Sequence, residues 1–271
     1  MDKTLQKKLK RLKKILSEME SLLVAYSGGA DSSLLLKVAS NVLSDKVLAV
    51  TAESPTYPQS EINQAKKLAN KLKIKHLIIK TDEFKNPNFL KNPADRCYYC
   101  KKELFGKLKK IAKKHKLNFV ADGSNLDDNK DYRPGSKAVK EFKIRSPLKE
   151  ARLTKRDIRE LSKNFRLPTW DKPALACLAS RMPYNEKITK KDLKKVQKAE
   201  EAIKKLGFKQ VRVRHHKNLA RIEVPEKEIS KIINYRRKLI GEFKKIGYNY
   251  VCIDLQGYRT GSMNEALRIQ F

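Results

Sequence analysis

The sequence is poor in acidic residues and in tryptophan, and it has no long apolar run. Its 271 residues contain 30 Asp and Glu against 63 Lys and Arg, for a formal net charge of +33, and a single Trp. No stretch approaches the roughly 20 consecutive apolar residues that a membrane-spanning helix needs. The basic N-terminal segment also lacks the apolar centre of a signal peptide. We therefore expect a cytoplasmic protein with no membrane partner, whose cysteines stay reduced unless they are catalytic or bind a metal.

The excess of positive charge is spread along the chain. Lysines recur at solvent-facing positions in nearly every predicted helix. No Lys/Arg block alternates with aromatic residues in the way that single-strand RNA grooves do. Some of the charge suits an anionic small molecule such as a nucleotide. Most of it predicts a solvated surface, and we expect no nucleic-acid partner.

Short apolar runs alternate with amphipathic helical patterns over the first half of the chain. This alternation predicts an α/β fold built on a doubly wound parallel sheet. The expected strands and helices cover residues 21–27, 31–43, 46–54, 59–72, 75–82, 100–115 and 118–125. An amphipathic helix precedes them, with Leu5, Leu12 and Leu16 on its apolar face, and we expect it to pack on the same domain.

A change of pattern divides the chain. Residues 168–188 hold three prolines and little periodicity, which predicts an irregular connection after a first domain over residues 1–167. Just before it, Thr154 and Asp157 have the spacing of an N-cap pair that begins a helix. Residues 189–271 predict a second, smaller α/β domain. Its expected helices cover residues 190–206 and 226–246, and its strands cover residues 210–216, 219–224 and 250–255.

The segment VAYSGGADSS predicts a strand, a tight glycine turn and a helix start. Gly28 and Gly29 permit positive φ and close approach of a ligand to the backbone. The helix that begins near Asp31 offers free N–H groups and the positive end of its dipole, which together bind phosphate. Capping of this helix by Ser27 or Asp31 would not by itself need two adjacent glycines. Asp31 would repel phosphate unless Mg²⁺ lies between them.

This turn is neither of the common phosphate loops. It has no lysine at the Walker A position and no G-x-G-x-x-G spacing. Ligands of doubly wound sheets bind beyond the carboxyl ends of the strands. Three polar corners are expected at that edge, and we predict that they converge on one pocket. They are residues 27–29, 52–54 and 122–124.

The four cysteines are spaced unevenly. Cys97 and Cys100 form a C-x-x-C pair at a helix start, where the dipole favours thiolate. A redox dithiol and half of a zinc site both fit that pair. Cys177 lies in the connection, and Cys252 lies in an apolar strand, where we expect a buried core thiol. Three thiolates would suit a [4Fe–4S] cluster with one open iron. Alternatively, Cys177 acts alone as a sulfur donor, or the pair resolves a persulfide on Cys177.

The SGGADS turn and the segment ADGSNLDD at residues 121–128 resemble the SGGxDS loop and its companion in the N-type ATP pyrophosphatases. The resemblance implies the adenine nucleotide α-hydrolase fold. It also implies that the loop grips the β- and γ-phosphates while reaction occurs at the α-phosphate, releasing pyrophosphate. It assigns Mg²⁺ to Asp31. It assigns ATP to Ser27, Gly28, Gly29, Asp31, Ser32, Asp122 and Gly123.

Further motifs along the chain resemble one particular family. The segments ESPTYPQSE, NPADRCYYCKKELF, KPALACLASRMPYNEKIT, GFKQVRVRHH and ARIEV follow one another in order. They are similar to the LarE family, the ATP-dependent sulfur transferases of nickel-pincer nucleotide biosynthesis, over about residues 5–265. The resemblance implies that ATP adenylates a carboxylate of pyridinium-3,5-biscarboxylic acid mononucleotide and that sulfur then displaces AMP to give a thiocarboxylate. It also implies a homo-oligomer supplied by a sulfide source or a sulfur-donor protein.

The resemblance gives the cysteines a role. Cys177 matches the cysteine that one branch of the family sacrifices as its sulfur donor, which leaves dehydroalanine. The extra pair matches a second branch, in which Cys97, Cys100 and Cys177 together hold a [4Fe–4S] cluster. We therefore expect a cluster-dependent enzyme that is not consumed by its own reaction.

Several residues of the predicted second domain suit the phosphate of such a substrate. Arg212 and Arg214 alternate onto one face of a predicted strand, where both could bind phosphate bidentately or lie on a solvated face. Glu223 orients these arginines or forms a cross-strand ion pair. Ser180 and Arg181, just after Cys177, are further phosphate candidates. Arg133 either closes on the ATP phosphates or holds its own turn.

Two other functions remain open at this point. A tRNA thiolase would also join this loop to a three-cysteine cluster, and the charge of +33 suits RNA. The C-terminal motifs favour the small nucleotide instead. A non-catalytic basic scaffold is the third reading, and the intact glycine turn and cysteines argue against it.

Overall fold

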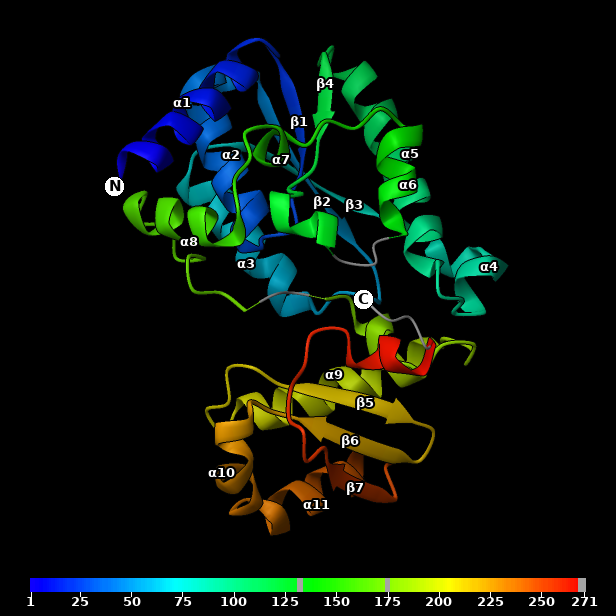
Figure 1. Ribbon diagram of the computed structural model, residues 1–271. Coiled ribbons are helices and arrows are strands. Elements are labelled where there is room, and N and C mark those ends of the chain that lie inside the picture. Colours follow the sequence, from blue (N-terminus) through cyan, green and yellow to red (C-terminus); the bar gives the residue numbers. More distant parts are fainter. Residues whose placement is uncertain (131–133, 174–175, 268–271) are drawn as a thin grey trace. The chain divides into compact units, whose positions relative to one another are not determined.

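The computed structural model describes residues 1–130, 134–173 and 176–267. The chain separates into two compact units (Figure 1). Residues 1–85 and 95–175 form the first unit. Residues 86–94 and 176–271 form the second.

The first unit is built on a four-stranded parallel sheet in the order β3-β2-β1-β4. This confirms the predicted α/β class with a parallel sheet. Leu22 of β1 pairs in register with Val47 of β2 on one side and Phe119 of β4 on the other. The strands are β1 (Leu22–Ala25), β2 (Val47–Glu53), β3 (Lys75–Lys80) and β4 (Phe119–Ala121).

Helices cover both faces of this sheet (Figure 1). On β1, Leu22 and Val24 join the apolar cluster that contains α1, α2 and α8, whereas Leu23 joins the cluster of α5 on the opposite face. Burial on both faces explains why the strands read as continuous apolar runs rather than alternating ones. The helices are α1 (Lys3–Ser17), α2 (Ala30–Leu43), α3 (Gln59–Lys71), α5 (Arg96–Lys114), α6 (Gly135–Glu141), α7 (Pro147–Glu150) and α8 (Lys155–Asn164).

The helices predicted for this unit are confirmed. The N-terminal helix buries Leu5, Leu12 and Leu16 on its own unit, as its spacing indicated. Helices α6 and α7 were not predicted, since each is too short to show a repeating apolar pattern.

The start of α8 follows the predicted capping pattern. The backbone N–H of Asp157 donates to Thr154 Oγ1 at 3.2 Å, and the N–H of Thr154 donates to Asp157 Oδ2 at 2.9 Å. Lys8 Nζ also lies 2.6 Å from Asp157 Oδ2, which ties α8 to α1. Burial by itself would raise the pKa of Asp157, but the hydrogen bonds from Lys8 and Thr154 outweigh it and keep this pKa below its usual value.

The second unit has a three-stranded sheet in the order β5-β6-β7. Strands β5 and β6 are antiparallel, and β6 and β7 are parallel. Its apolar core contains Phe208, Phe243 and Tyr248. Its elements are α4 (Pro87–Leu90), α9 (Lys190–Lys204), β5 (Arg212–His216), β6 (Leu219–Glu223), α10 (Ile229–Ile233), α11 (Arg236–Ile246) and β7 (Tyr250–Ile253).

The single helix predicted over residues 226–246 is wrong. A short 3-10 turn, Glu226–Glu228, is followed by α10 and α11, with a break at Asn234 and Tyr235. No Pro or Gly marks this break in the sequence. The Tyr235 ring packs edge-on against Phe208, with centroids 6.1 Å apart, so a tertiary contact accompanies the change of direction.

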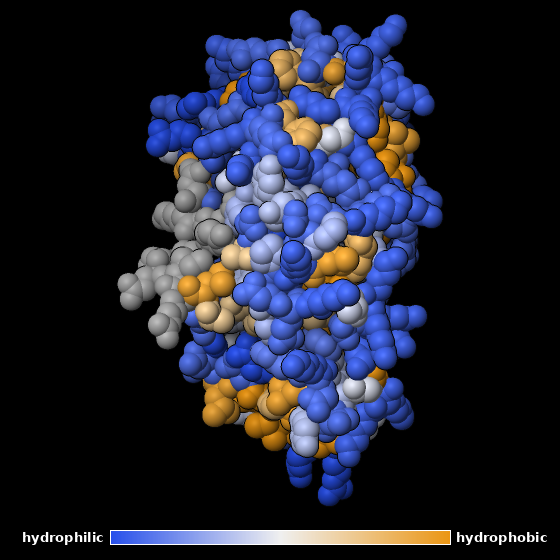
Figure 2. Space-filling view, turned by 90° about the vertical axis from the view of Figure 1, so that its right-hand side faces the viewer, coloured by the Kyte–Doolittle hydropathy of each residue, from blue (hydrophilic) through white to orange (hydrophobic). Residues whose placement is uncertain are grey.

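Two properties of the surface agree with the composition. On the face shown in Figure 2, hydrophilic side chains cover most of the surface and apolar side chains form small separate patches. Within the described ranges, no helix has the length and apolar character needed to cross a membrane.

We expect Thr154→Ala to lower the free energy of unfolding by about 1 kcal/mol, because alanine removes the acceptor for the Asp157 N–H. Denaturant titration of the folded protein measures this. Thr4→Ala, at an exposed position inside α1, is the matched control and should cost nothing measurable. Equal effects of the two substitutions would contradict a stabilising role for the cap.

Candidate nucleotide and cysteine sites

The glycine turn leaves β1 and enters α2 in a conformation that requires glycine. Gly28 has φ +71°, and a Cβ added to it would lie 2.9 Å from the Cβ of Ala65 on α3. Gly29 is the N-cap residue of α2 and supplies no side chain to cap the helix. The N–H groups of the first turn of α2 therefore keep the arrangement that favours an anionic ligand.

The side chains of Ser27 and Ser32 stabilise this turn by hydrogen bonds. The hydroxyls of Ser27 and Ser32 lie 3.1 Å apart, and the Ser27 N–H donates to Ser32 Oγ at 3.3 Å. Ser32 Oγ also lies 3.3 Å from the carbonyl oxygen of Gly29. Both hydroxyls thus hold the turn closed on the start of α2.

The third predicted corner packs against the same helix start. A Cβ on Gly123 would lie 3.0 Å from the backbone N of Ser32, so glycine permits the close approach. Asp122 accepts hydrogen bonds from the hydroxyls of Ser124 at 2.7 Å and Ser146 at 2.8 Å. The residues predicted to bind ATP therefore gather around the beginning of α2.

The carboxylates of Asp31 and Asp122 each lie beside a lysine. Lys155 Nζ forms an ion pair with Asp31 Oδ2, while Asn125 Nδ2 donates to Asp31 Oδ1 at 3.2 Å. Lys101 Nζ lies 3.7 Å from Asp122 Oδ2. Positive charge is thus present beside each carboxylate, where phosphates would otherwise be repelled.

Sequence reasoning missed these lysines, although one of them carried a signal. Lys155 is the first residue of α8, and a cation is unfavourable at the positive end of a helix dipole. A basic residue in that position therefore indicates a partner elsewhere in the fold. Lys101 had no such signal.

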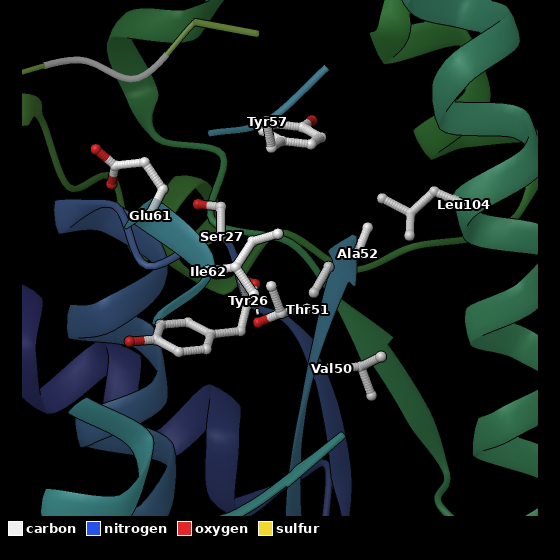
Figure 3. A pocket seen from close by; sticks show the side chains of 10 residues that line it. Tyr26, Ser27, Val50, Thr51, Ala52, Tyr57, Glu61, Ile62 and Leu104 are labelled. Atoms are coloured by element: carbon white, nitrogen blue, oxygen red, sulfur yellow. Dashed lines mark hydrogen bonds between the residues drawn. The ribbon is translucent and has the colours of Figure 1, made fainter. Parts of the chain in front are cut away.

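A pocket opens next to the turn, at the carboxyl ends of β1 and β2 (Figure 3). It has a volume of about 470 Å³, part of it open to solvent. Ile62 of α3, Ala52 of β2 and Leu104 of α5 give it apolar walls, and Ser27 and Glu61 add polar groups. Apolar walls with a few polar groups are typical of small-molecule sites. Residues 27 and 52, from two of the predicted corners, line this pocket.

The C-x-x-C pair lies in the first unit, close to this corner. Cys97 and Cys100 are half-buried in the first turns of α5, three residues apart and hence on one side of the helix. Lys101, the next residue, is the one whose ammonium faces Asp122. The side chain that follows the pair therefore reaches the predicted ATP residues.

Cys177 belongs to the second unit and begins a tight turn. Its carbonyl oxygen accepts hydrogen bonds from Ser180 Oγ at 2.8 Å and from an Arg181 guanidinium nitrogen at 2.9 Å. The Cys177 side chain is half-buried. Cys252 is also half-buried, on the edge strand β7, so the expectation of a fully buried core thiol is wrong.

The arginines predicted to bind phosphate form a nearly buried network. Arg181 pairs with Glu200 on α9 at 2.8 Å, and Arg214 pairs with Glu223 at 2.6 Å. A second Arg214 nitrogen donates to the carbonyl oxygen of Ser180 at 3.1 Å. The network therefore holds the Cys177 turn against β5, and the phosphate role of these residues stays a prediction.

Arg212 lies next to this network. Val213 points into the apolar core, which places Arg212 and Arg214 on the other face of β5. Burial, followed by the nearby Arg181 guanidinium, lowers the pKa of Arg212 to about 10. An anion placed there would offset the repulsion between these two cations. Glu200 was not foreseen, although it lies on the buried face of α9, four residues after Val196 and three before Ile203, where an acid indicates a buried partner.

The structure describes no ready metal site. Within residues 1–130, 134–173 and 176–267, no group of three His, Cys, Asp or Glu side chains surrounds a possible ion position. The expected role of Arg133 lies outside the described residues.

The fold and the glycine turn define an ATP-using enzyme of the PP-loop class, and the NAD synthase family model matches residues 4–91. Three relatives match nearly the whole chain. The protein slr1717 of Synechocystis sp. is 43% identical over 265 residues, which are 97% of this chain and 99% of that protein. The protein MJ0830 of Methanocaldococcus jannaschii is 38% identical over 259 residues, 94% and 98% of the two chains.

The third relative carries a functional name. The pyridinium-3,5-bisthiocarboxylic acid mononucleotide synthase of Lactiplantibacillus plantarum is 37% identical over 265 residues, 97% of this chain and 96% of that enzyme. The chain belongs to this family, the LarE family, and it is an ATP-utilising sulfurtransferase.

We expect Gly28→Ala to weaken ATP binding at least about tenfold, because a left-handed alanine is strained and its Cβ would collide with Ala65. Titration calorimetry with ATP measures this. Gly241→Ala on α11 is the control, since no atom lies within 4 Å of the added Cβ and alanine favours a helix. Unchanged ATP affinity in Gly28→Ala would contradict the placement of phosphate at this turn.

Proposed function

We propose that this protein adenylates a carboxylate of pyridinium-3,5-biscarboxylic acid mononucleotide and converts it to a thiocarboxylate. Two rounds give the bisthiocarboxylic product named for the Lactiplantibacillus plantarum relative. The observation that carries the proposal is the match to that enzyme over 97% of the chain. The uncapped glycine turn beside an apolar pocket supports the use of ATP.

The chemistry explains why ATP is needed. A carboxylate is a poor acyl donor because its leaving group would be an oxide. Attack of a carboxylate oxygen on the α-phosphorus forms an acyl adenylate and expels pyrophosphate. A sulfur nucleophile then adds to the acyl carbon and expels AMP, which leaves the thiocarboxylate.

The residues of the first unit suit the first of these steps. We assign the adenine to the apolar pocket and the β- and γ-phosphates to the start of α2. Ser27, Gly28, Gly29 and Ser32 form the turn. Lys155 and Lys101 lie beside Asp31 and Asp122, where they add positive charge opposite the departing pyrophosphate. Mg²⁺ is suited to Asp31 because it prefers carboxylate and phosphate oxygens.

The second unit suits the substrate. The phosphate and the carboxylates of the substrate are anionic. Arg212 and Arg214, which share one face of β5, are suited to bind such groups. We assign the substrate phosphate to Arg181, Arg212 and Arg214 with Ser180, and the orientation of Arg214 to Glu223. Cys177 begins the turn that Ser180 and Arg181 hold through its backbone carbonyl, so this cysteine belongs to the same turn as residues assigned to the substrate.

We further propose that the sulfur comes from a [4Fe–4S] cluster bound by Cys97, Cys100 and Cys177. Three cysteine thiolates are a suitable set of ligands for a [4Fe–4S] cluster, and they leave one iron free of protein ligands. Cys97 and Cys100 lie on the same side of α5, which is an arrangement that two ligands of one cluster require. When bound, the cluster would supply sulfur that is not part of the polypeptide. In the alternative, Cys177 gives up its own sulfur and becomes dehydroalanine.

Cys177→Ser should abolish thiocarboxylate formation while pyrophosphate release continues, because serine supplies neither sulfur nor a thiolate ligand. Mass spectrometry of the product and a pyrophosphate assay measure the two steps separately. Cys252→Ser on β7 is the matched control and should behave as the unaltered protein. An undiminished thiocarboxylate yield in Cys177→Ser would sink the role given to this cysteine.

Anaerobically purified protein should contain about four irons and four acid-labile sulfides per chain, because a [4Fe–4S] cluster has that composition. Cys97→Ser should lose them and Cys252→Ser should keep them. Metal analysis, sulfide analysis and the visible spectrum report this result. The cluster proposal would be contradicted if the protein were free of iron and could not be reconstituted. A loss of the mass of hydrogen sulfide from Cys177 after turnover would then support the sacrificial cysteine instead.

A further inference from the structure

Lys172 follows α8 in the chain and returns to the glycine turn. Its side chain is only 13% exposed. Its ammonium donates to the carbonyl oxygen of Gly28 at 3.1 Å and to Gln64 Oε1 at 2.9 Å, and it lies 2.6 Å from Glu61 Oε2. Gly28 and Gln64 accept two of the three ammonium hydrogens, and the contact with Glu61 is an ion pair without hydrogen-bond geometry.

The contacts of Lys172 link the glycine turn to α3. Glu61 and Gln64 are both on α3, which also carries Ala65, the residue that Gly28 approaches. The turn is therefore held to α3 by a steric contact on one side and by a lysine on the other.

The contact with Gly28 controls a neighbouring donor. The Gly28 carbonyl and the Gly29 N–H belong to one planar trans peptide, so they point in opposite directions. A bond that holds the carbonyl toward α3 consequently directs the Gly29 N–H away from it, to the side where Ser27 Oγ accepts a long hydrogen bond from it at 3.4 Å. Gly28 has no side chain and a left-handed φ, so its own sterics restrict this peptide little.

Lys172 also compensates an acid at the pocket. Glu61 lines the pocket beside Ser27, as Figure 3 shows. An uncompensated carboxylate there would repel the phosphates of ATP.

We propose that Lys172 is a positioning residue for ATP. It holds the Gly28–Gly29 peptide so that the turn is ready for phosphate before ATP arrives. The inference rests on the proposed binding of ATP phosphates at this turn. It requires no contact between Lys172 and the nucleotide.

The test compares ATP with adenosine, which has no phosphate. Lys172→Met should weaken ATP binding about tenfold or more, because a charge-assisted hydrogen bond and a charge balance are both lost. Adenosine binding should change less than about twofold, since the apolar pocket is intact. Titration calorimetry gives both dissociation constants. Lys67→Met, an exposed lysine on α3, is the matched control and should leave both unchanged.

Two further variants separate positioning from charge and from folding. Lys172→Arg keeps the charge, but a planar guanidinium cannot reproduce the two hydrogen bonds and the ion pair of the ammonium, so it should still weaken ATP binding several-fold. Lys172→Met combined with Glu61→Gln removes the acid as well, and the loss of ATP affinity should persist.

The inference alone would be overturned by unchanged ATP affinity in Lys172→Met, by an equal loss for ATP and adenosine, or by full recovery in the variant that also carries Glu61→Gln. Failure of the unaltered protein to bind ATP would instead overturn the proposed function, and this inference with it. Full ATP affinity in Lys172→Arg would show that charge suffices and would also overturn it.

Discussion

The close approach of Gly28 to α3 is the constraint on which the nucleotide corner, the group of residues around the start of α2 that we propose bind ATP, depends. A left-handed glycine with no room for a Cβ lets the chain leave β1 and enter α2 within a few residues. The same turn leaves α2 without a side-chain cap. The free N–H groups of its first turn are costly unless water or a ligand satisfies them. The geometry that brings the backbone close to α3 is therefore also the geometry that makes an anion site.

Electrostatic compensation follows from that arrangement. The residues proposed to bind ATP include Asp31 and Asp122, and each carboxylate has a lysine from a different helix beside it. In the second unit the pattern is reversed, because buried arginines dominate and Glu200 and Glu223 balance them. In both arrangements, the charged side chains that we propose lie near an anionic ligand already have protein partners of opposite charge. For the proposed binding of anionic ligands, the large formal charge of the chain is thus less important than the few cations with defined partners.

The cysteines are distributed over both units, and this distribution bears on sulfur transfer. The C-x-x-C pair begins α5, whose Lys101 faces Asp122 of the nucleotide corner. Cys177 begins a turn held by Arg181 and by the contact of Arg214 with Ser180. In the proposed reaction, adenylation and sulfur delivery act on the same carboxyl group. Each unit therefore carries thiols next to the residues proposed for one part of the reaction.

The sequence by itself determined most of the longer helices and strands, since periodicity, the glycine pair and the Thr154–Asp157 cap act over a few residues. It also identified the family, because the motifs around Cys97 and Cys177 are local. Only the tertiary structure decided the partners of Asp31 and Gly28. Lys155 lies 124 residues from Asp31, and Lys172 lies 144 residues from Gly28. It also decided the break between α10 and α11, where Tyr235 meets Phe208. Such contacts depend on how distant helices cross the sheet, and no local pattern encodes that.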